Sequence, residues 1–128
     1  MASNGANAAE APESIDMAAG EISISEILHE LGTGIYVNNL WYLNYSDRPA
    51  GRITGMTRFA TFWVEGGEIV APLNVMRFDE SLYRMLGANL VGLTREREIV
   101  IDAQSYGGRS VVSQQLPGAL IDDFPLTL

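Results

Sequence analysis

Alternating apolar and polar positions dominate the middle of the chain, from Trp41 to Arg77, and predict a series of strands there. In residues 59–64 both alternating sets of side chains contain aromatic or β-branched residues, which predicts a strand buried on two sides. The alternation resumes at Ile69 after two consecutive glycines, Gly66 and Gly67. Because both turn residues of a type I′ hairpin need a positive φ, this Gly-Gly pair predicts a hairpin.

The same period of two predicts further strands on either side of this hairpin. They cover residues 35–37, 40–45 and 52–58 before it, and residues 99–101, 110–113 and 119–121 after it. Asp47 and Pro49 predict a turn between the second and third of these strands, and Gly107-Gly108 predict a turn near the end of the chain.

A helical period of apolar residues occurs in two short segments. In the first, Ile24, Ile27, Leu28 and Leu31 share one face, and Gly32 or Gly34 ends the helix. Its start fits a capping box of Ser23 and Glu26, with Ser25 as the alternative cap.

The second helical segment follows Asp79, which we expect to be its N-cap. Its apolar face consists of Leu82, Met85, Leu86 and Leu90. Arg95 to Glu98 alternate in charge, and we expect them to form a solvated loop. The sequence thus predicts a β-dominated α+β fold with antiparallel sheets, hairpins and two short helices.

The first part of the chain has a different composition from the rest. Residues 1–19 are rich in alanine, contain acidic residues and have no basic residue, so we expect a disordered lead-in. Residues 20–128 are then a single β-rich domain, in keeping with the length of the chain.

Composition excludes several classes of function. The formal net charge is −8 and all eight basic residues are arginines, which argues against a nucleic-acid-binding surface. There is no cysteine, so disulfides, cysteine zinc sites and thiol nucleophiles are impossible. We see neither a signal peptide nor a membrane-spanning run, and expect a cytoplasmic protein that binds no membrane.

Few residues suggest catalysis. The only histidine, His29, precedes a glutamate, but the position one turn later is Thr33, whereas a zincin helix needs a second histidine there. We therefore expect His29 to be a half-buried or surface helix residue. The acid pairs Asp79-Glu80 and Asp122-Asp123 are expected to cap or to be solvated, and no G-x-S-x-G nucleophile motif occurs. We predict no catalytic and no metal-binding residue.

Aromatic residues in the predicted strands are the remaining candidates. We expect most of them to lie in the core: Trp41, Tyr42, Tyr45, Phe59, Phe62 and Trp63. The alternative is a groove in which an extended peptide adds as a strand, with Arg58 and Arg77 holding a peptide carboxylate. The candidate peptide-contact residues are Trp41, Tyr42, Arg58 and Arg77. If the two arginines have no such role, we expect internal salt bridges with Glu65, Glu68 or Asp79.

The series Thr54–Arg58, Val64–Pro72 and Arg77–Ser81, continuing to Met85-Leu86, resembles the C-terminal part of the TldD/PmbA family. That family was once called modulators of DNA gyrase and is grouped with metallopeptidases. Gly34–Val37, Leu40–Tyr42 and Leu116–Phe124 resemble flanking strands of the same region, in the same order.

The resemblance also implies where zinc is bound. Catalytic family members hold zinc with a His-Glu-x-x-x-His helix from an upstream segment and a cysteine from the C-terminal domain. No segment here matches that helix motif, and residues 104–108, which match the cysteine region, contain Ser105 and Tyr106 instead. The chain therefore resembles the PmbA (TldE-like) partner branch, without catalytic activity alone, and zinc is expected only in a catalytic partner or a missing segment.

Three hypotheses follow. In the first, the chain is the C-terminal domain of a TldD/PmbA-like protein, as a fragment or a reduced gene product. It would shape the peptide path or hold a TldD-like subunit or the N-terminal portion, within a two-subunit assembly that degrades or trims unfolded peptides, including leader peptides. In the second, it is an independent β-rich binding module with no peptidase role. In the third, it is a non-functional remnant that self-associates as a homo-oligomer.

Overall fold

The computed structural model describes residues 14–101, 103 and 112–128, and it confirms a β-dominated α+β fold. Its strands form three sheets of three strands each. Sheet I has the order β1-β9-β8, sheet II has the order β2-β5-β6, and sheet III has the order β3-β4-β7. All pairs are antiparallel except β1–β9, which is parallel.

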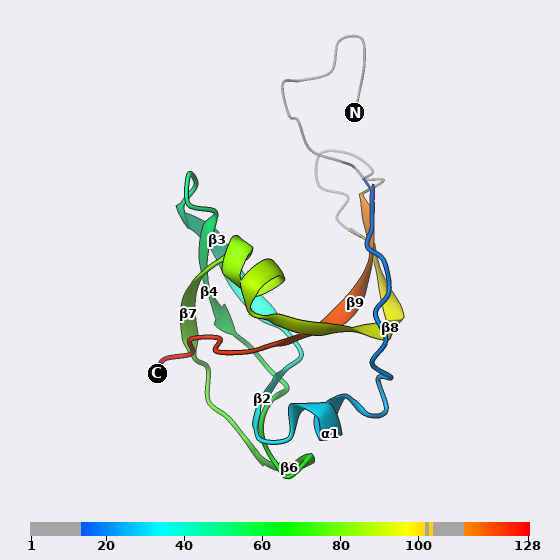
Figure 1. The fold of residues 1–128 in the computed structure, drawn as a ribbon. Helices are drawn as coiled ribbons and strands as arrows, with labels where there is room; N and C mark the ends of the chain where they lie inside the picture. Colours follow the sequence, from blue (N-terminus) through cyan, green and yellow to red (C-terminus); the bar gives the residue numbers. More distant parts are fainter. Residues whose placement is uncertain (1–13, 102, 104–111) are drawn as a thin grey trace.

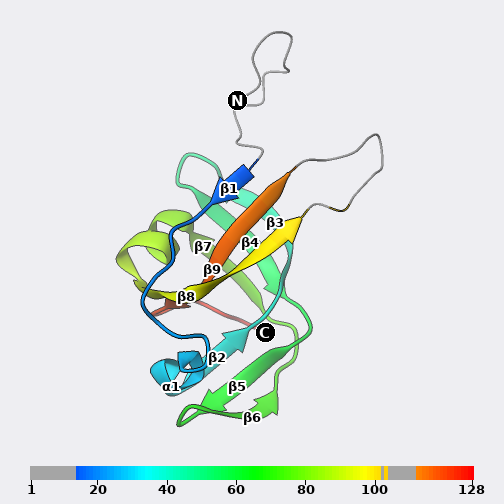
Figure 2. The same cartoon turned by 90° about the vertical axis from the view of Figure 1, so that its right-hand side faces the viewer.

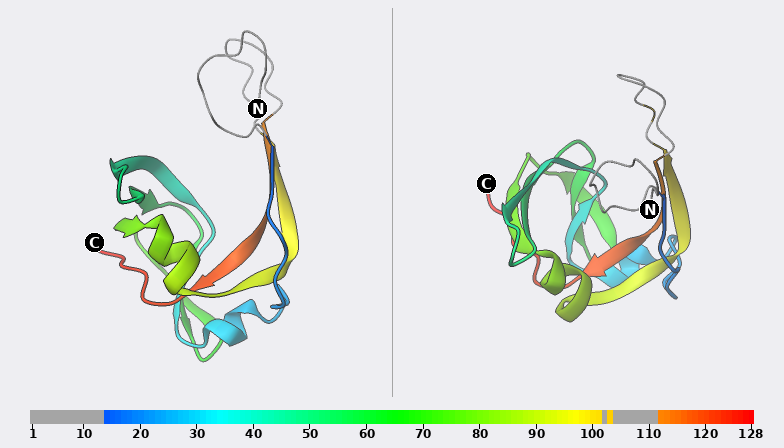
Figure 3. Two further views of the ribbon diagram at one scale, coloured as in Figure 1. Left: turned by 45° about the horizontal axis from the view of Figure 1, so that its top comes forward. Right: turned by 90° about the horizontal axis from the view of Figure 1, so that it is seen from above.

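The three sheets lie on different sides of the molecule. Figure 1 shows sheet III on one side, sheet I on the other, and sheet II with helix α1 (Ile27–Leu31) below them. The view from above in Figure 3 shows the same C-shaped arrangement. The two sides of the molecule thus carry different sheets.

Sheet II contains the predicted hairpin. β5 (Thr61–Glu65) and β6 (Glu68–Pro72) are joined by Gly66 and Gly67, whose φ angles are 59° and 83°. β2 (Gly34–Val37) pairs with the other edge of β5, so β5 is the central strand (Figure 2). Thr61 and Val64 are buried on opposite faces of β5, which confirms the predicted two-sided burial.

Sheet III consists of β3 (Leu40–Asp47), β4 (Arg52–Thr57) and β7 (Arg77–Ser81). The prediction of Asp79 as a helix N-cap is wrong, because β7 pairs with β4 and the Asp79 carboxylate binds Arg52, with Nη2 and Oδ1 2.7 Å apart. The hydroxyl of Ser81 instead accepts a hydrogen bond from the Tyr83 backbone N–H.

The two helices agree with the prediction only in part. α1 ends at Gly32, where φ is 64°, as predicted. The capping box is wrong, because Glu26 makes no side-chain capping bond and the Ser23 hydroxyl bonds the Ser25 hydroxyl at 2.8 Å. The second helix is a π-helix, η1 (Arg84–Ala88), and Leu90 lies beyond it.

Sheet I is built on β8 (Leu90–Ile101) and β9 (Ser113–Ile121), with the short β1 (Ser14–Asp16) at the edge of β9. The expectation of a loop at Arg95–Glu98 is wrong, because these residues lie within β8, where the register shifts between Leu93 and Arg97. The predicted turn at Gly107-Gly108 and residues 110–111 of the predicted strand at 110–113 lie outside the described residues.

Residues 17–24, here called the strap, follow β1 and run from β9 to β8. Met17 N–H donates to Gln115 at 3.0 Å on β9, whereas Gly20 N–H donates to Thr94 at 2.9 Å on β8. A Cβ at Gly20 would lie 2.1 Å from the Leu93 carbonyl oxygen, so this approach requires glycine. β1 already pairs with β9 at residues 14–16, whereas the sequence analysis placed the start of the domain at Gly20. Residues 1–13 lie outside the described part of the chain.

The alternating charges of β8 hold the strap in place. The Arg97 guanidinium binds the Asp16 carboxylate and the Met17 carbonyl, and Arg95 Nη2 donates to the Glu21 carbonyl at 3.0 Å. The Glu96 carboxylate accepts the Ile24 N–H at 2.7 Å. These three residues therefore serve as a polar clasp between the strap and β8.

Few apolar side chains are buried in the described part of the chain. Only Val64, Met76 and Phe78 fall in the buried class among its hydrophobic residues, and Phe78 packs on Phe124 with ring centroids 5.2 Å apart. Exposed apolar residues are concentrated on β3, on the end of β8 and on β6: Leu40, Trp41, Tyr42, Leu43, Tyr45, Ile69, Val70, Ile99, Val100 and Ile101. In the described residues, no helix has the length and apolar character needed to cross a membrane.

The hairpin turn provides a matched pair of glycine substitutions. Gly66 and Gly67 both have positive φ, so alanine at either should cost about 1–2 kcal/mol of unfolding free energy. A Cβ at Gly67 would also lie 3.1 Å from the His29 Cα, while a Cβ at Gly66 meets no atom within 4 Å. We expect Gly67→Ala to be more destabilising than Gly66→Ala in urea unfolding; an equal loss would contradict the close approach of turn and helix.

The clasp predicts a pH dependence. The hydrogen bond from Ile24 N–H lowers the pKa of Glu96 below its ordinary 4.5, so its stabilisation is present above that pH and is lost as the pH falls through the folded-state pKa. Glu96→Gln should therefore lower the thermal midpoint at pH 7, and the difference from the unmodified chain should shrink below pH 4.5.

The control for this experiment is Glu98→Gln, two positions further along β8, where the side chain is exposed. It should leave the midpoint unchanged across the same pH range, measured by circular dichroism. Equal effects of the two substitutions would show that Glu96 does not hold the strap.

Candidate functional site

Three side chains form a row across one face of sheet III. The register pairs Trp41 on β3 with Met56 on β4, and Met56 with Arg77 on β7. Directly paired residues of neighbouring strands point to the same face of a sheet. Trp41 and Arg77, two of the residues chosen from the sequence, therefore lie on one face with Met56 between them.

Arg58 lies on the same face and covers the tryptophan. Its guanidinium carbon is 4.1 Å from the centre of the Trp41 ring and 5.6 Å from the centre of the Phe59 ring. A guanidinium over an indole is favourable because the ring face is electronegative. We call the pair of Trp41 and Arg58 the Trp–Arg stack.

The stack is open to solvent. Trp41 is 52% exposed, Tyr42 70% and Phe59 64%, and all eight residues of β3 are in the exposed class. The expectation that these aromatic residues and Tyr45 lie in the core is wrong, because β3 is an edge strand paired with β4 alone in the described structure. Phe62 and Trp63, on the central strand β5, are half-buried.

Two residues in left-handed backbone conformation flank the stack along the chain. Tyr42, directly after Trp41, has a φ of 59°, and Ala60, two residues after Arg58, has a φ of 56°. Positive φ is unfavourable for residues with a Cβ, and such residues are enriched at functional sites. At Tyr42 the conformation coincides with the register shift of β3 against β4 between Trp41 and Asn44.

Neither Arg58 nor Arg77 has an ion pair in the part of the chain that the structure describes. Arg77 is held through its backbone, which exchanges hydrogen bonds of 2.7 and 2.9 Å with Thr127. The alternative of internal salt bridges with Glu65, Glu68 or Asp79 is therefore wrong.

Asp79 is occupied by other partners. A hydrogen bond with the Ser46 side chain and the Arg52 guanidinium lower the pKa of Asp79 below its ordinary 3.8. Its carboxylate thus remains charged and bound to Arg52 at neutral pH.

The sequence analysis missed a second arginine–aromatic contact and the contribution of Phe59 to the stack. The Arg48 guanidinium carbon lies 5.5 Å from the centre of the Tyr45 ring, at the far end of β3 from Trp41. The signal available in the sequence was the short spacing of Tyr45 and Arg48 across a turn. This contact is a natural control for the Trp–Arg stack.

The acid pairs take structural roles. Asp123 accepts a hydrogen bond from Arg84 Nη2 at 3.0 Å, and the Asp122 carbonyl accepts one from Asn89 Nδ2 at 2.9 Å. Glu80 is only 3% exposed, and its carboxylate accepts the Ser81 N–H and lies 3.7 Å from Arg84 Nε. These contacts join η1 to the segment after β9 and to β7.

The described residues do not fit a zinc site. They contain no group of three or more histidine, cysteine or acidic side chains placed to hold a metal ion. His29 is exposed on α1, and the chain has one histidine and no cysteine to supply the nitrogen and sulfur ligands that zinc prefers. Residues 104–108, which resemble the family's cysteine region, lie outside the described residues.

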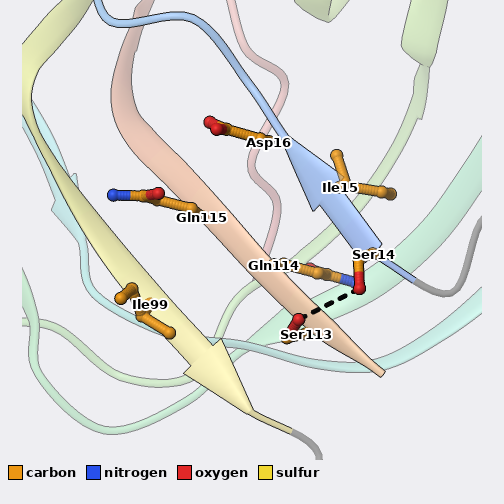
Figure 4. A pocket seen from close by; sticks show the side chains of 7 residues that line it. All are labelled: Ser14, Ile15, Asp16, Ile99, Ser113, Gln114 and Gln115. Carbon is orange, nitrogen blue, oxygen red and sulfur yellow. Dashed lines mark hydrogen bonds between the residues drawn. The ribbon is translucent and has the colours of Figure 1, made fainter. Parts of the chain in front are cut away.

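A shallow depression of about 250 Å³ lies on sheet I, between β1, β9 and the end of β8 (Figure 4). Two of its polar residues have partners: the hydroxyls of Ser14 and Ser113 are 3.2 Å apart, and the Asp16 carboxylate is paired with Arg97. Because its one carboxylate is already held in an ion pair, we take the Trp–Arg stack as the stronger candidate site.

Comparison with known families gives one match. Residues 2–127 match the family model described as the PmbA/TldA metallopeptidase C-terminal domain. A search of curated proteins found no match.

Proposed function

The chain belongs to the PmbA/TldA metallopeptidase C-terminal domain family, and we propose that it is the non-metal partner in a peptide-processing assembly. In this role it shapes the path of an unfolded peptide and holds a zinc-bearing, TldD-like subunit or segment. The zinc and the hydrolytic step belong to that subunit or segment, in the cytoplasm. Cleavage of unfolded or leader peptides is then an activity of the assembly.

The observation that carries this proposal is the excess of exposed apolar side chains over buried ones. Ile99 and Ile101 on one face of β8 are each 66% exposed, and Val100 on the other face is 53% exposed. A strand with branched aliphatic residues on both faces is typical of one covered on both sides. Large exposed apolar patches mark interaction surfaces in soluble proteins, so we assign the end of β8 to a protein partner.

The edge strand β3 supports a peptide-binding role. It has eight residues, all exposed, and its outer edge has no strand partner in the described structure. An extended peptide can add to such an edge through main-chain hydrogen bonds, which depend little on the peptide's sequence. Trp41 and Tyr42 would then contact side chains of the peptide. Binding mainly through the main chain suits an assembly that acts on unfolded peptides of varied sequence.

The second candidate function is an independent binding module. The same exposed stack favours it, because Trp41 and Arg58 could bind a ligand without any partner subunit. The two functions differ in whether the chain forms a stable complex with a zinc-bearing family member.

The test is to mix the chain with a zinc-bearing TldD-like subunit from the same source and to measure mass by size exclusion with light scattering. We expect a stoichiometric complex, and we expect Ile99→Ser with Ile101→Ser to weaken it about tenfold or more, because two exposed aliphatic side chains are lost from the contact. Val91→Ser is the matched control, since Val91 lies on the same strand and is 62% exposed.

A folded monomer that forms no complex would refute the partner role and favour the independent module. A complex that tolerates both isoleucine substitutions would leave the partner role intact and would refute the end of β8 as the contact surface.

A further inference from the structure

We propose that Arg58, held on Trp41, is the receptor for the C-terminal carboxylate of an extended peptide that pairs antiparallel with β3. This inference rests on the proposed peptide-binding role and names the group that the site recognises. It assigns Arg58 to direct contact with the carboxylate, and Arg77 to a weaker, longer-range contribution.

The first argument is the unused bonding capacity of Arg58. Several arginines of the described chain bind carboxylates, as Arg52 does with Asp79 and Arg84 with Asp123. Arg58 makes neither an ion pair nor a side-chain hydrogen bond with any described residue, although the chain has a net charge of −8. An anion brought by a ligand is therefore the natural partner of this guanidinium.

The second argument is preorganisation. The guanidinium lies over the indole at 4.1 Å, and stacking uses the flat face of the group, so its N–H donors remain available at the edge. These donors match the two oxygens of a carboxylate in a bidentate arrangement. Because the indole already restrains the side chain, less conformational entropy is lost when a carboxylate binds.

The third argument is the position of the stack on the strand. Trp41 is the second residue of β3, and Arg58 directly follows the last residue of β4, so both lie at the end of sheet III where β3 begins. A peptide that runs antiparallel to β3 has its C-terminal end beside the start of β3. Its terminal carboxylate would then be presented to Arg58, while the rest of the peptide extends toward Asp47.

The backbone of Arg77 lies farther from that end of β3 than the backbone of Arg58 does. It is two strands away from β3 in the row through Met56, and neighbouring strands are about 4.8 Å apart, which gives a separation of about 10 Å from Trp41. That distance is close to the Debye length at physiological salt, so the effect of Arg77 on a carboxylate at Arg58 should be small and should vary with salt.

The experiment uses calorimetric titration of the full chain with an eight-residue peptide that has uncharged side chains and a blocked N-terminus, in two forms. One has a free C-terminal carboxylate and the other a C-terminal amide. We expect the carboxylate form to bind about tenfold more tightly or better, because a hydrogen bond between charged groups is stronger than one between neutral groups. Equal binding of the two forms would overturn the proposal and leave the proposed peptide path standing.

The variants separate the arginines. Arg58→Gln should remove the preference for the carboxylate over the amide, and Arg58→Lys should keep part of this preference, because the charge remains without the fork of donors. Arg48→Gln is the matched control, since Arg48 also lies over an aromatic ring of β3. It should keep the full preference, and Arg77→Gln should change it less than about twofold at 0.15 M salt.

A third peptide tests the source of the carboxylate. It has an amidated C-terminus and one internal glutamate, and we expect it to bind like the uncharged amide. Binding as tight as that of the free carboxylate form would overturn recognition of the terminus in favour of an acidic side chain. If none of the three peptides binds, both this inference and the peptide-binding part of the proposed function fail, whereas complex formation with a zinc-bearing subunit is tested separately.

Discussion

Buried threonine hydroxyls form hydrogen bonds with the backbone at points where a strand is irregular or where the chain passes from one sheet to the next. At the irregularity of β8, Thr94 donates to the Glu96 carbonyl and accepts the Gly118 N–H, both at 2.7 Å. Thr57, at the end of β4, accepts the Met76 N–H, and Thr61, at the start of β5, donates to the Arg58 carbonyl. Each buried backbone group left without its partner would cost about 1–3 kcal/mol, a large part of the stability of a small domain. The position of Arg58 over Trp41 depends on one of these bonds, the one between the Thr61 hydroxyl and the Arg58 carbonyl.

These hydrogen bonds matter because the hydrophobic core is small. Few apolar side chains are buried in the described part of the chain, and apolar residues on β3 and β8 are exposed to water. Such a domain is stabilised further when a partner covers these surfaces, because burial of apolar area contributes about 25 cal/mol per Å². The exposed edges that limit its own stability are the features that suit it to bind another chain.

The sequence predicted those parts of the fold that depend on local rules. The hairpin at Gly66-Gly67 and the end of α1 at Gly32 were correct, because glycine adopts the positive φ of these positions without strain. Asp79 and the run Arg95–Glu98 were misread, because their partners, Arg52 and the strap, are far away in the chain. In the site, the register places Trp41 and Arg77, two of the candidates taken from the sequence, on one face, and their contact with a peptide stays a prediction. The stacking of Arg58 on Trp41 depends on the register of β3 against β4, which the sequence does not specify.

The central claim is that the exposed surfaces of β3 and the end of β8 are built to be covered by other chains. Hydrogen exchange measured by mass spectrometry, on the chain alone and then with its zinc-bearing subunit and a bound peptide, tests this most directly. We expect residues 40–47 and 98–101 to exchange rapidly in the isolated monomer and to become protected in the assembly, while the region around Val64 stays protected in both. Protection of both segments in the isolated monomer, unchanged by partner and peptide, would contradict the account.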